Sequence, residues 1–526
     1  MSTQTLPVAA EVPRASAVAA APEHTRKARA GLAMSVATFA MAAASGIQAV
    51  LYLSRFGTNA RTDGFFVAFA LYSTFGVFSQ SLRVTSVPLL VEPGARLSIR
   101  RFAGVLCAVG ALVVLLTCAL PGPLSHLLAP GLKDAGRSVT AAALPVLGVA
   151  MALQLAASGG ATVLAIRDRF MTIAGAYMSG ALAGLVAFVA LMGSAGVQTL
   201  GWSMLAMSIV TSGWMLAGLR RSGWLAGGER AAPATGGPLA GLLRDCAAVL
   251  GRTAIYLMFN VLFVITLAFA SRSAAGGTTV LSYAYLFASY LVAGTGMALG
   301  MSSIPDMTRD ARTQAREAVA AMVPRGFRYA MLIVAPALGA LIVCGAPLVH
   351  DVLPKSLSSA QVSTLRTFTA LLILWTLGAL LVNFLLPLLL ALGRDRLLGA
   401  LAVPLVLVHV AATAAGSALF GVDGAVGAFW IAPSLLAGTL LVAGAGRELA
   451  AALARELAGD ALRFVGLAAL AFASGWGIGE ALHAGLAQAL IAGVIGASVY
   501  LAGLGLVARP QLETLLRTVV VRPSPA

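Results

Sequence analysis

The sequence predicts an all-α membrane protein with about fourteen transmembrane helices. Only 10% of the 526 residues are charged and 59% are hydrophobic, at a mean hydropathy of +0.93, whereas a soluble domain carries roughly 25% charged residues. Apolar runs recur from Gly31 to the C-terminal region, and each is long enough to cross about 30 Å of hydrocarbon. The runs are continuous instead of alternating, so they predict helices and not the strands of a barrel.

The first elements in chain order are a tail and a span. Residues 1–30, rich in Ala, Pro, Ser and Thr, are predicted to form a disordered cytoplasmic N-terminus. The apolar run that follows is too long for a signal-peptide core, and we expect it to remain as the first span. The predicted spans are 31–54, 64–91, 102–129, 139–165, 170–193, 198–219, 246–271, 277–305, 327–352, 361–392, 398–420, 424–444, 461–482 and 485–508.

Longer connections divide the spans into two lobes and a C-terminal pair. The predicted parts are an N-lobe of six spans (31–219), a cytoplasmic linker (220–245), a C-lobe of six spans (246–444), an interfacial amphipathic segment (445–460), the last two spans (461–508) and a cytoplasmic tail (509–526). The amphipathic segment contains Arg447 and Arg455, and we expect it to lie at the cytoplasmic interface.

The distribution of basic residues supports this division and gives an orientation. If the N-terminus is cytoplasmic, the even-numbered connections are cytoplasmic too, and they hold most of the basic residues. The odd-numbered connections hold few, namely Arg55, Arg61, Lys133, Arg137, Arg272, Lys355 and Arg366. The positive-inside rule therefore predicts a multi-pass protein of the bacterial cytoplasmic (inner) membrane with both termini in the cytoplasm.

A faint internal repeat relates the second and the eighth predicted span. Phe66 to Pro88 reads FVAFALYSTFGVFSQSLRVTSVP, and Tyr283 to Pro305 reads YAYLFASYLVAGTGMALGMSSIP. Both segments begin with small and aromatic residues and end in Ser-Val-Pro or Ser-Ile-Pro. An offset of six spans keeps the orientation, which predicts two six-helix lobes related by a pseudo-two-fold axis along the membrane normal, facing a central cavity.

The sequence lacks the patterns of catalytic and nucleic-acid-binding proteins. Cys107, Cys118 and Cys344 lie in apolar runs, and no CxxC or Cys/His cluster indicates a disulfide or a metal site. There is no Ser-His-Asp set, P-loop or nucleic-acid-binding module, and topology explains the net charge of +16. We therefore expect no enzyme activity, metal or cofactor, and energy for transport from an ion gradient, the membrane potential or a substrate gradient.

Two motifs indicate a family. FGTNARTDGFFVAFALYSTF from Phe56, followed by FSQ at Phe78 and VPLLVE at Val87, resembles the second-helix signature of the MurJ/MviN lipid II flippase family. That family belongs to the multidrug/oligosaccharidyl-lipid/polysaccharide exporter superfamily. The seventh span is similar to the family at Asn260-Val-Leu-Phe, and the eighth is similar at Ser282-Tyr-Ala and Gly296-Met-Ala-Leu-Gly. Pro387 with Ala391-Leu-Gly-Arg-Asp is a further similarity. The resemblance implies the fold and an export activity for this chain.

The chain departs from that family at its charged residues. In an ungapped alignment from Gly57, the family's helix-1 arginines and aspartate fall on Ala42, Gln48 and Ala49, its helix-2 arginines near Thr74 to Gly76, its helix-2 glutamate near Ser79, and its helix-8 aspartate and arginine on Tyr285 and Leu286. Guanidinium groups bind phosphate oxygens in bidentate fashion. Their loss leaves the resemblance without support for lipid II as the cargo.

The charged substrate-cavity candidates are Arg83, Asp63, Arg61 and Arg272. Arg83 is an intramembrane charge that either contacts an anion in the cavity or reaches the inner headgroups. Asp63 begins the second span and either lines the cavity or caps its own helix. Arg61 and Arg272 stand at the outer mouths of the two repeat-bearing spans, as interfacial anchors or as attractants for an anionic headgroup.

The uncharged candidates are polar residues within the spans. Gln48, at the position of a lost arginine, Asn260, Tyr283 and Tyr285 are further cavity candidates. For Asn260, as for Asn383, hydrogen bonding between helices is the alternative. His409 is the coupling candidate because it can titrate near neutral pH, and a neutral core histidine is the alternative.

These observations predict a MurJ/MviN-like flippase or exporter. It would move a lipid-linked or amphipathic cell-envelope precursor outwards by alternating access, in contact with membrane lipids and cell-envelope synthesis proteins, and without nucleic acid. An exporter of a soluble or drug-like compound is the first alternative, because the lost arginines favour a less anionic cargo. A non-transporting membrane scaffold for cell-envelope synthesis is the second.

Overall fold

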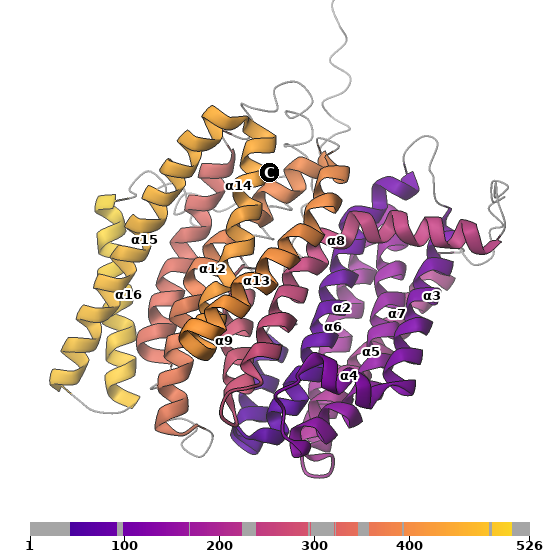
Figure 1. The fold of residues 1–526 in the computed structure, drawn as a ribbon, viewed down its shortest axis with the longest axis horizontal. Helices are drawn as coiled ribbons and strands as arrows, with labels where there is room; N and C mark the ends of the chain where they lie inside the picture. Colours follow the sequence, from indigo (N-terminus) through magenta and orange to yellow (C-terminus); the bar gives the residue numbers. More distant parts are fainter. Residues whose placement is uncertain are drawn as a thin grey trace, which may run out of the picture.

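The computed structural model describes residues 41, 43–91, 98–167, 169–222, 238–292, 295, 320, 322–345, 357–391, 394–482 and 486–507. Every regular element in these residues is a helix (Figure 1). The predicted N-terminal segment, the centre of the predicted linker and the C-terminal tail lie outside them. The prediction of an all-α, multi-span protein is confirmed.

The N-lobe forms one bundle, drawn from indigo to purple in Figure 1. Its central helix is α5, which packs against α2, α3 and α7. Its elements are a helix over residues 43–56, α2 (Ala60–Val91), α3 (Ile99–Ala119), the short α4 (Pro121–Leu128), α5 (Asp134–Ile166), α6 (Phe170–Leu191), the 3-10 turn η1 (Gly196–Gln198) and α7 (Thr199–Arg221).

The C-lobe lies to the left of the N-lobe in Figure 1, and the C-terminal pair, α15 and α16, lies at the far left. Their elements are α8 (Pro238–Ala270), α9 (Gly277–Val292), a helix over Met322–Gly345 that ends in the π-helical turn η3 (Leu341–Gly345), α12 (Ser359–Ala391), α13 (Asp395–Gly427), the 3-10 turn η4 (Ala428–Trp430), α14 (Ile431–Ala445), α15 (Arg447–Leu482) and α16 (Leu486–Val507). The last two helices form a hairpin beside the C-lobe.

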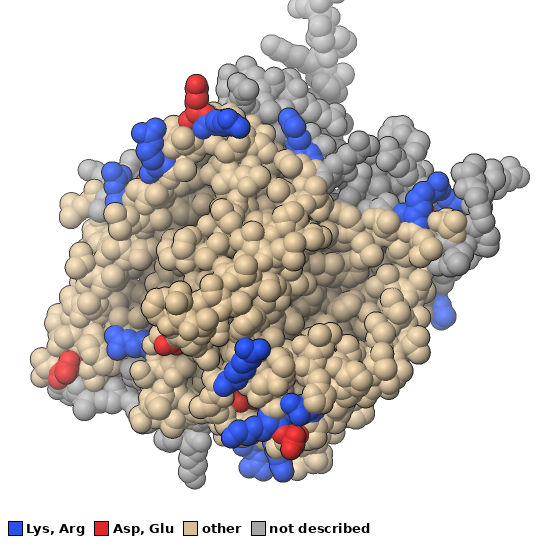
Figure 2. All heavy atoms as spheres, viewed as in Figure 1, with Lys and Arg blue, Asp and Glu red and all other residues tan. Residues whose placement is uncertain are grey.

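Ten helical segments of the described residues are long and apolar enough to cross a membrane. One of them, Leu397–Ala445, contains two predicted spans, and the predicted break between residues 420 and 424 coincides with Gly421 at φ +64°. Gly416 and Gly424 pack backbone to backbone at this turn, where a Cβ on either would overlap the other's carbonyl oxygen. Lys, Arg, Asp and Glu gather at the two ends of the molecule, and an uncharged belt separates them (Figure 2).

α8 connects the two lobes. It begins at Pro238, ahead of the predicted span. Within it, Thr253–Ala270 is the part that is long and apolar enough to cross a membrane. Its first part runs across the end of the N-lobe (Figure 1), where Val249 packs in a cluster with Phe78 and Phe102. α13 of the C-lobe packs along α8, with Gly399 beside Gly251 and His409 beside Leu262 and Thr266. One continuous helix therefore contacts both lobes.

α15 includes most of the residues that the sequence predicted as an interfacial segment. The residues predicted as an interfacial segment, 445–460, lie almost entirely in one 36-residue helix with the following span. Arg328 explains why the helix stays attached beyond the apolar belt: its guanidinium bonds Glu456 and Asp460, each at 2.6 Å. Asp460 is 8% exposed in its side chain, so this pairing compensates a nearly buried carboxylate.

Candidate functional site: the seam between the two lobes

The seam between the lobes runs where α2 lies beside α9, the helices that carry the sequence repeat. Equivalent residues of the repeat meet across it: the Phe66 and Tyr283 rings contact edge to face at 5.2 Å between centroids. The Thr279 and Thr62 hydroxyl oxygens lie 3.2 Å apart, and the two residues are 217 positions apart, as are Phe66 and Tyr283. The axis that relates the lobes therefore passes between the first turns of α2 and α9.

Asp63 joins the two lobes at this axis. Its Oδ2 accepts a hydrogen bond from the Gly276 N–H at 2.6 Å, and its Oδ1 accepts from the N–H and the hydroxyl of Thr279 at 2.9 and 2.7 Å. The side chain is buried. The first turn of a helix has unpaired N–H groups and the positive end of the dipole, both of which favour an anion. Asp63 of the N-lobe thus caps a helix of the C-lobe.

The local sequence explains why Asp63 is free to do this. Asn59 caps α2 instead, since its Oδ1 accepts from the N–H groups of Arg61 and Thr62 at 2.9 and 3.2 Å. α9 has no acidic residue in its own first turn, and Gly276 adopts φ +96°, a conformation that glycine reaches without a Cβ penalty. Asp63 therefore caps α9, and not its own helix α2 as one of the two sequence-based alternatives predicted.

Further polar contacts close the seam at one end of the molecule, which we call the Asp63 end. They are the Tyr283 hydroxyl to the Ala49 carbonyl (2.9 Å), the Thr58 hydroxyl to Gln361 Oε1 (2.6 Å) and the Gly131 N–H to Ser271 Oγ (3.0 Å). Each such neutral hydrogen bond contributes about 0.5–1.5 kcal/mol net. The seam is therefore held by several weak, reversible contacts and one charged cap.

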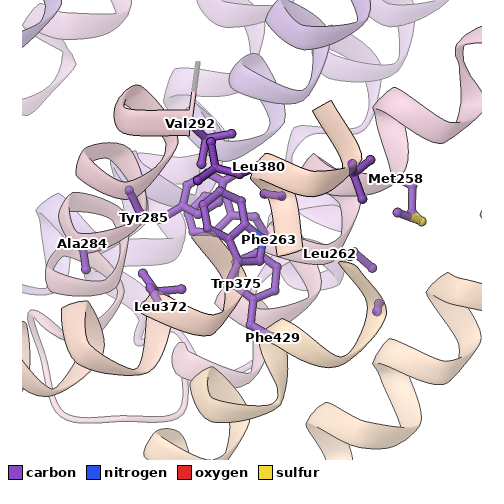
Figure 3. Packing of buried hydrophobic residues seen from close by; sticks show 14 of the residues in the cluster. Met258, Leu262, Phe263, Ala284, Tyr285, Val292, Leu372, Trp375, Leu380 and Phe429 are labelled. Carbon is purple, nitrogen blue, oxygen red and sulfur yellow. The ribbon is translucent and has the colours of Figure 1, made fainter. Parts of the chain in front are cut away.

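Tyr285 lies two residues from Tyr283 and points into the C-lobe core (Figure 3). Its ring stacks on Phe263 at 3.9 Å between centroids, and it lies 5.1 Å from Trp375 and 5.8 Å from Phe429. These rings come from α8, α12 and η4 and are all buried. Of the two predicted tyrosines, Tyr283 contacts the other lobe and Tyr285 packs within its own.

His409 lies fully buried between α13 and α8. Its Nε2 is 3.0 Å from both the Leu262 carbonyl and the Thr266 hydroxyl. A donor at Nε2 satisfies the carbonyl, which leaves Nδ1 as the acceptor, and Nδ1 has no partner among the described residues. This geometry is that of a neutral histidine bridging two helices, and its role in coupling stays a prediction.

The uncharged candidates other than the tyrosines lie inside the lobes. Gln48 is buried and directs Nε2 towards Gly184 of α6, since a Cβ built there would lie 3.5 Å from this atom and 3.3 Å from the Ser203 carbonyl oxygen. Asn260 is buried in α8. Asn383 donates to the Ala379 carbonyl of its own helix at 2.8 Å. The described contacts therefore bring neither Gln48 nor Asn383 to the seam.

The arginine candidates fall into two groups. Arg61 and Arg272 are exposed at the Asp63 end, beside the closed seam. Arg83 lies within α2, and its side chain is outside the described part of the chain. In that described part, no group of three or more His, Cys, Asp or Glu side chains is arranged to hold a metal ion.

Sequence reasoning missed the partners of Asp63. Gly276 and Thr279 belong to a Gly-Gly-Thr-Thr run that opens α9. Thr58 and Thr62 lie in the corresponding region at the start of α2. A helix start without its own acidic cap was visible in the sequence and indicated a need for an outside acceptor. The sequence could not tell which acceptor supplied it.

The comparisons with known proteins identify the fold. No protein-family model and no curated protein matches the chain. Among solved structures, the lipid II flippase MurJ in an inward closed conformation is similar, with a TM-score of 0.71 at 15% identity over 91% of this chain and 99% of that chain. An inward-facing multidrug resistance MATE transporter of the MOP superfamily gives 0.55 at 16% identity over 80% and 99%.

A mutant of the Vibrio cholerae MATE transporter VcmN gives a TM-score of 0.57 at 11% identity over 81% of this chain and 98% of that chain. The chain therefore has the fold that MurJ and the MATE transporters share. This confirms the structural part of the resemblance that the motifs of the second and eighth spans predicted.

Proposed function

We propose that the protein is a MurJ/MviN-like transporter that moves an amphipathic, lipid-linked cell-envelope precursor outwards across the bacterial cytoplasmic membrane by alternating access. The single observation that carries this proposal is the helix cap that Asp63 of one lobe makes on α9 of the other. A cap between lobes holds only one of two arrangements, because separating the lobes at this end breaks it and hydrates both partners. The likeness in fold to MurJ supports the same function.

The contacts of the seam and of α8 give the motion that transport requires. Opening the Asp63 end separates α9 from α2 and from the helix over residues 43–56, which breaks the hydrogen bonds and the Phe66–Tyr283 ring contact described above and parts apolar side chains that pack across the seam. α8 is fixed to the N-lobe through Val249 and to the C-lobe through α13. Rocking of the lobes must therefore move α8 relative to at least one of them, since it packs against α2 as well as α13.

The charge distribution sets the orientation in this proposal. The Asp63 end carries the odd-numbered connections, which are poor in basic residues, and so faces outwards under the positive-inside rule. Both termini and the end that holds the Arg328 ion pairs then face the cytoplasm. The structure accordingly corresponds to the state that is closed towards the outside.

One specific observation favours a second candidate for the cargo. The positions that carry family arginines hold Gln48 and Leu286, and Gln48 is directed into the N-lobe bundle. Fewer fixed cations favour a cargo with less charge than a pyrophosphate, because an unpaired anion in a low-dielectric cavity is costly. An exporter of a soluble or drug-like compound is therefore the second candidate. A non-transporting scaffold is the third, and it applies if the protein transports neither kind of compound.

A disulfide lock tests alternating access directly. Thr62 and Thr279 have hydroxyl oxygens 3.2 Å apart across the seam, so a Cys pair at these positions, in a variant without the four native cysteines, should oxidise readily. Proteoliposomes would be given two probes, a fluorescent polyprenyl pyrophosphate and a cationic dye. We expect transport of one probe, its loss on oxidation and its return on reduction.

The controls are the two single-cysteine variants, which should transport in both redox states. Transport that continues after complete cross-linking would contradict the proposed motion. Transport of the dye alone would select the second candidate, and movement of neither probe would favour the scaffold. We also expect that the chain does not replace an essential lipid II flippase in a depleted strain, and growth at the wild-type rate would restore lipid II as the cargo.

A further inference from the structure

We propose that the Asp63 end carries a binding site for a multivalent phosphate-type anion, built by Arg61, Lys133 and Arg137 of the N-lobe together with Arg272 of the C-lobe. We call these four residues the basic platform. They come from three separate stretches of sequence, and basic residues are sparse in the connections of this end. Their convergence is therefore a property of the tertiary structure.

Close backbone contacts bring the four residues together. The Gly131 N–H donates to Ser271 Oγ at 3.0 Å, and a Cβ at Gly131 would lie 2.6 Å from the Arg272 nitrogen. Only glycine permits this approach, which sets Arg272 of the C-lobe next to the N-lobe turn that ends in Lys133.

A second glycine contact places the other pair. A Cβ at Gly136 would lie 2.6 Å from the Ala60 carbonyl oxygen. A Cβ at Gly64 would overlap the Gly136 carbonyl oxygen. Arg61 follows Ala60, and Arg137 follows Gly136. Both basic residues are therefore held at the same junction of α2 and α5.

Carboxylates near the platform do not neutralise it. Asp134 is fully exposed and reaches Arg137 Nη1 at 3.4 Å, a distance at which a surface ion pair contributes little. Asp63 already accepts three hydrogen bonds from α9. The Arg137 Nε atom has no acceptor in the described part of the chain, so protein groups do not fully pair this guanidinium.

The surroundings indicate the class of anion. Arg61, Lys133 and Arg272 are exposed, and the Arg272 guanidinium lies 5.3 Å from the Phe269 ring centroid, so this cation is partly oriented. Several guanidinium groups and an ammonium suit the planar and divergent oxygens of phosphate esters and pyrophosphates. Leu127 of α4, also at this end, is 75% exposed, so an apolar side chain lies accessible beside the charged residues.

Binding at the platform has a consequence for the seam. Arg272 and the other three residues belong to different lobes, so an anion that contacts both sides binds the closed arrangement better than the open one. By linkage, such an anion stabilises the closed Asp63 end in proportion to its occupancy. The platform requires no transport activity, so its test is independent of the cargo.

Inter-lobe distances measured between spin labels at Ser138 of α5 and Ser359 of α12, in lipid nanodiscs, test the proposal. Both residues are exposed at the Asp63 end on opposite lobes. In zwitterionic phosphatidylcholine, inorganic pyrophosphate at millimolar concentration should raise the closed population several-fold. The variant Arg272→Gln should lose this response, and Arg272→Lys should retain part of it.

The matched control is Arg366→Gln, an exposed arginine of α12 that takes no part in the contacts above, and it should respond like the wild type. Nanodiscs containing anionic phosphatidylglycerol distinguish the sources of the phosphate. A closed population that is already raised there, and lowered by Arg272→Gln, identifies a lipid headgroup; a response to pyrophosphate alone identifies a soluble or cargo-borne group. No response to either anion, or an equal response in Arg272→Gln, overturns the proposal.

Discussion

Removing the Asp63 carboxylate should open the seam at its own end. In Asp63→Ala, the Gly276 N–H and the N–H and hydroxyl of Thr279 lose their acceptor. Hydrogen bonds to a charged group contribute about 1.5–3 kcal/mol each. In the open arrangement water hydrates the same donors, so only part of this sum distinguishes the two states.

We take the difference between the two states as about 2–4 kcal/mol, a little under half of the sum of about 4.5–9 kcal/mol for the three bonds. Because 1.4 kcal/mol corresponds to a factor of ten in an equilibrium, the closed-to-open ratio should fall by about 30- to 700-fold. Asp63→Asn should have an intermediate effect. Its amide keeps one oxygen acceptor for Thr279, but its NH₂ group cannot accept from Gly276, and the charge that complements the α9 dipole is lost.

The assay is the distance distribution between spin labels at Ser138 and Ser359 in a variant without native cysteines. Wild-type protein should give a short inter-lobe distance for its closed population, and Asp63→Ala should shift that population towards a longer distance. The matched control is Asp134→Ala, which removes a fully exposed aspartate at the same end whose partner is Arg137 of its own helix. An unchanged distribution in Asp63→Ala, with the protein folded, would refute the reasoning that the cap holds the seam.

Three further predictions concern stability and topology. Arg328→Gln leaves the nearly buried Asp460 without its 2.6 Å partner and should cost about 1–3 kcal/mol, lowering the melting temperature, whereas Arg463→Gln, exposed and 4.0 Å from Asp460, should not. Gly424→Ala places a Cβ against the Gly416 carbonyl and should cost about 1–3 kcal/mol, seen as reduced folded yield, while Gly438→Ala, with open space around it, should be neutral. Single cysteines at the Asp63 end should react with an impermeant thiol reagent in intact cells, and cysteines at the opposite end should react only after permeabilisation. The exposed test positions are Lys133, Ala274 and Ser359 at the Asp63 end, and Arg100, Arg221 and Arg455 at the opposite end. Reversal at two or more of these sites would contradict the topology.

The sequence by itself determined the helices. The length of an apolar run is a local property, and the membrane's thickness converts it into a span without reference to any other part of the chain. The break near residue 421 could be predicted in the same way, because the run is interrupted by Gly421 and Asp423. The repeat between the second and eighth spans predicted the pairing of Phe66 with Tyr283 only in outline, as two equivalent segments related by an axis.

Continuity between elements was decided by packing. The residues around 445–460 look amphipathic on their own, and the sequence indicated an interfacial segment. In the structure Arg328 binds Glu456 and Asp460, and α15 continues through the predicted boundary. An ion pair between residues more than a hundred positions apart leaves no local signal.

The partners of the candidate residues were decided by tertiary structure alone. Asp63 is a first-turn aspartate, and local rules assign it to its own helix, but the packing of the lobes places its carboxylate on Gly276 and Thr279, more than 200 positions away. Tyr283 and Tyr285 are equally plausible cavity residues by sequence. Helix geometry separates two such side chains by about 200°, so they must face different ways, but this periodicity fixes only their relative direction; the packing of α9 between the seam and the C-lobe core decides that Tyr283 bonds Ala49 across the lobes and Tyr285 stacks on Phe263.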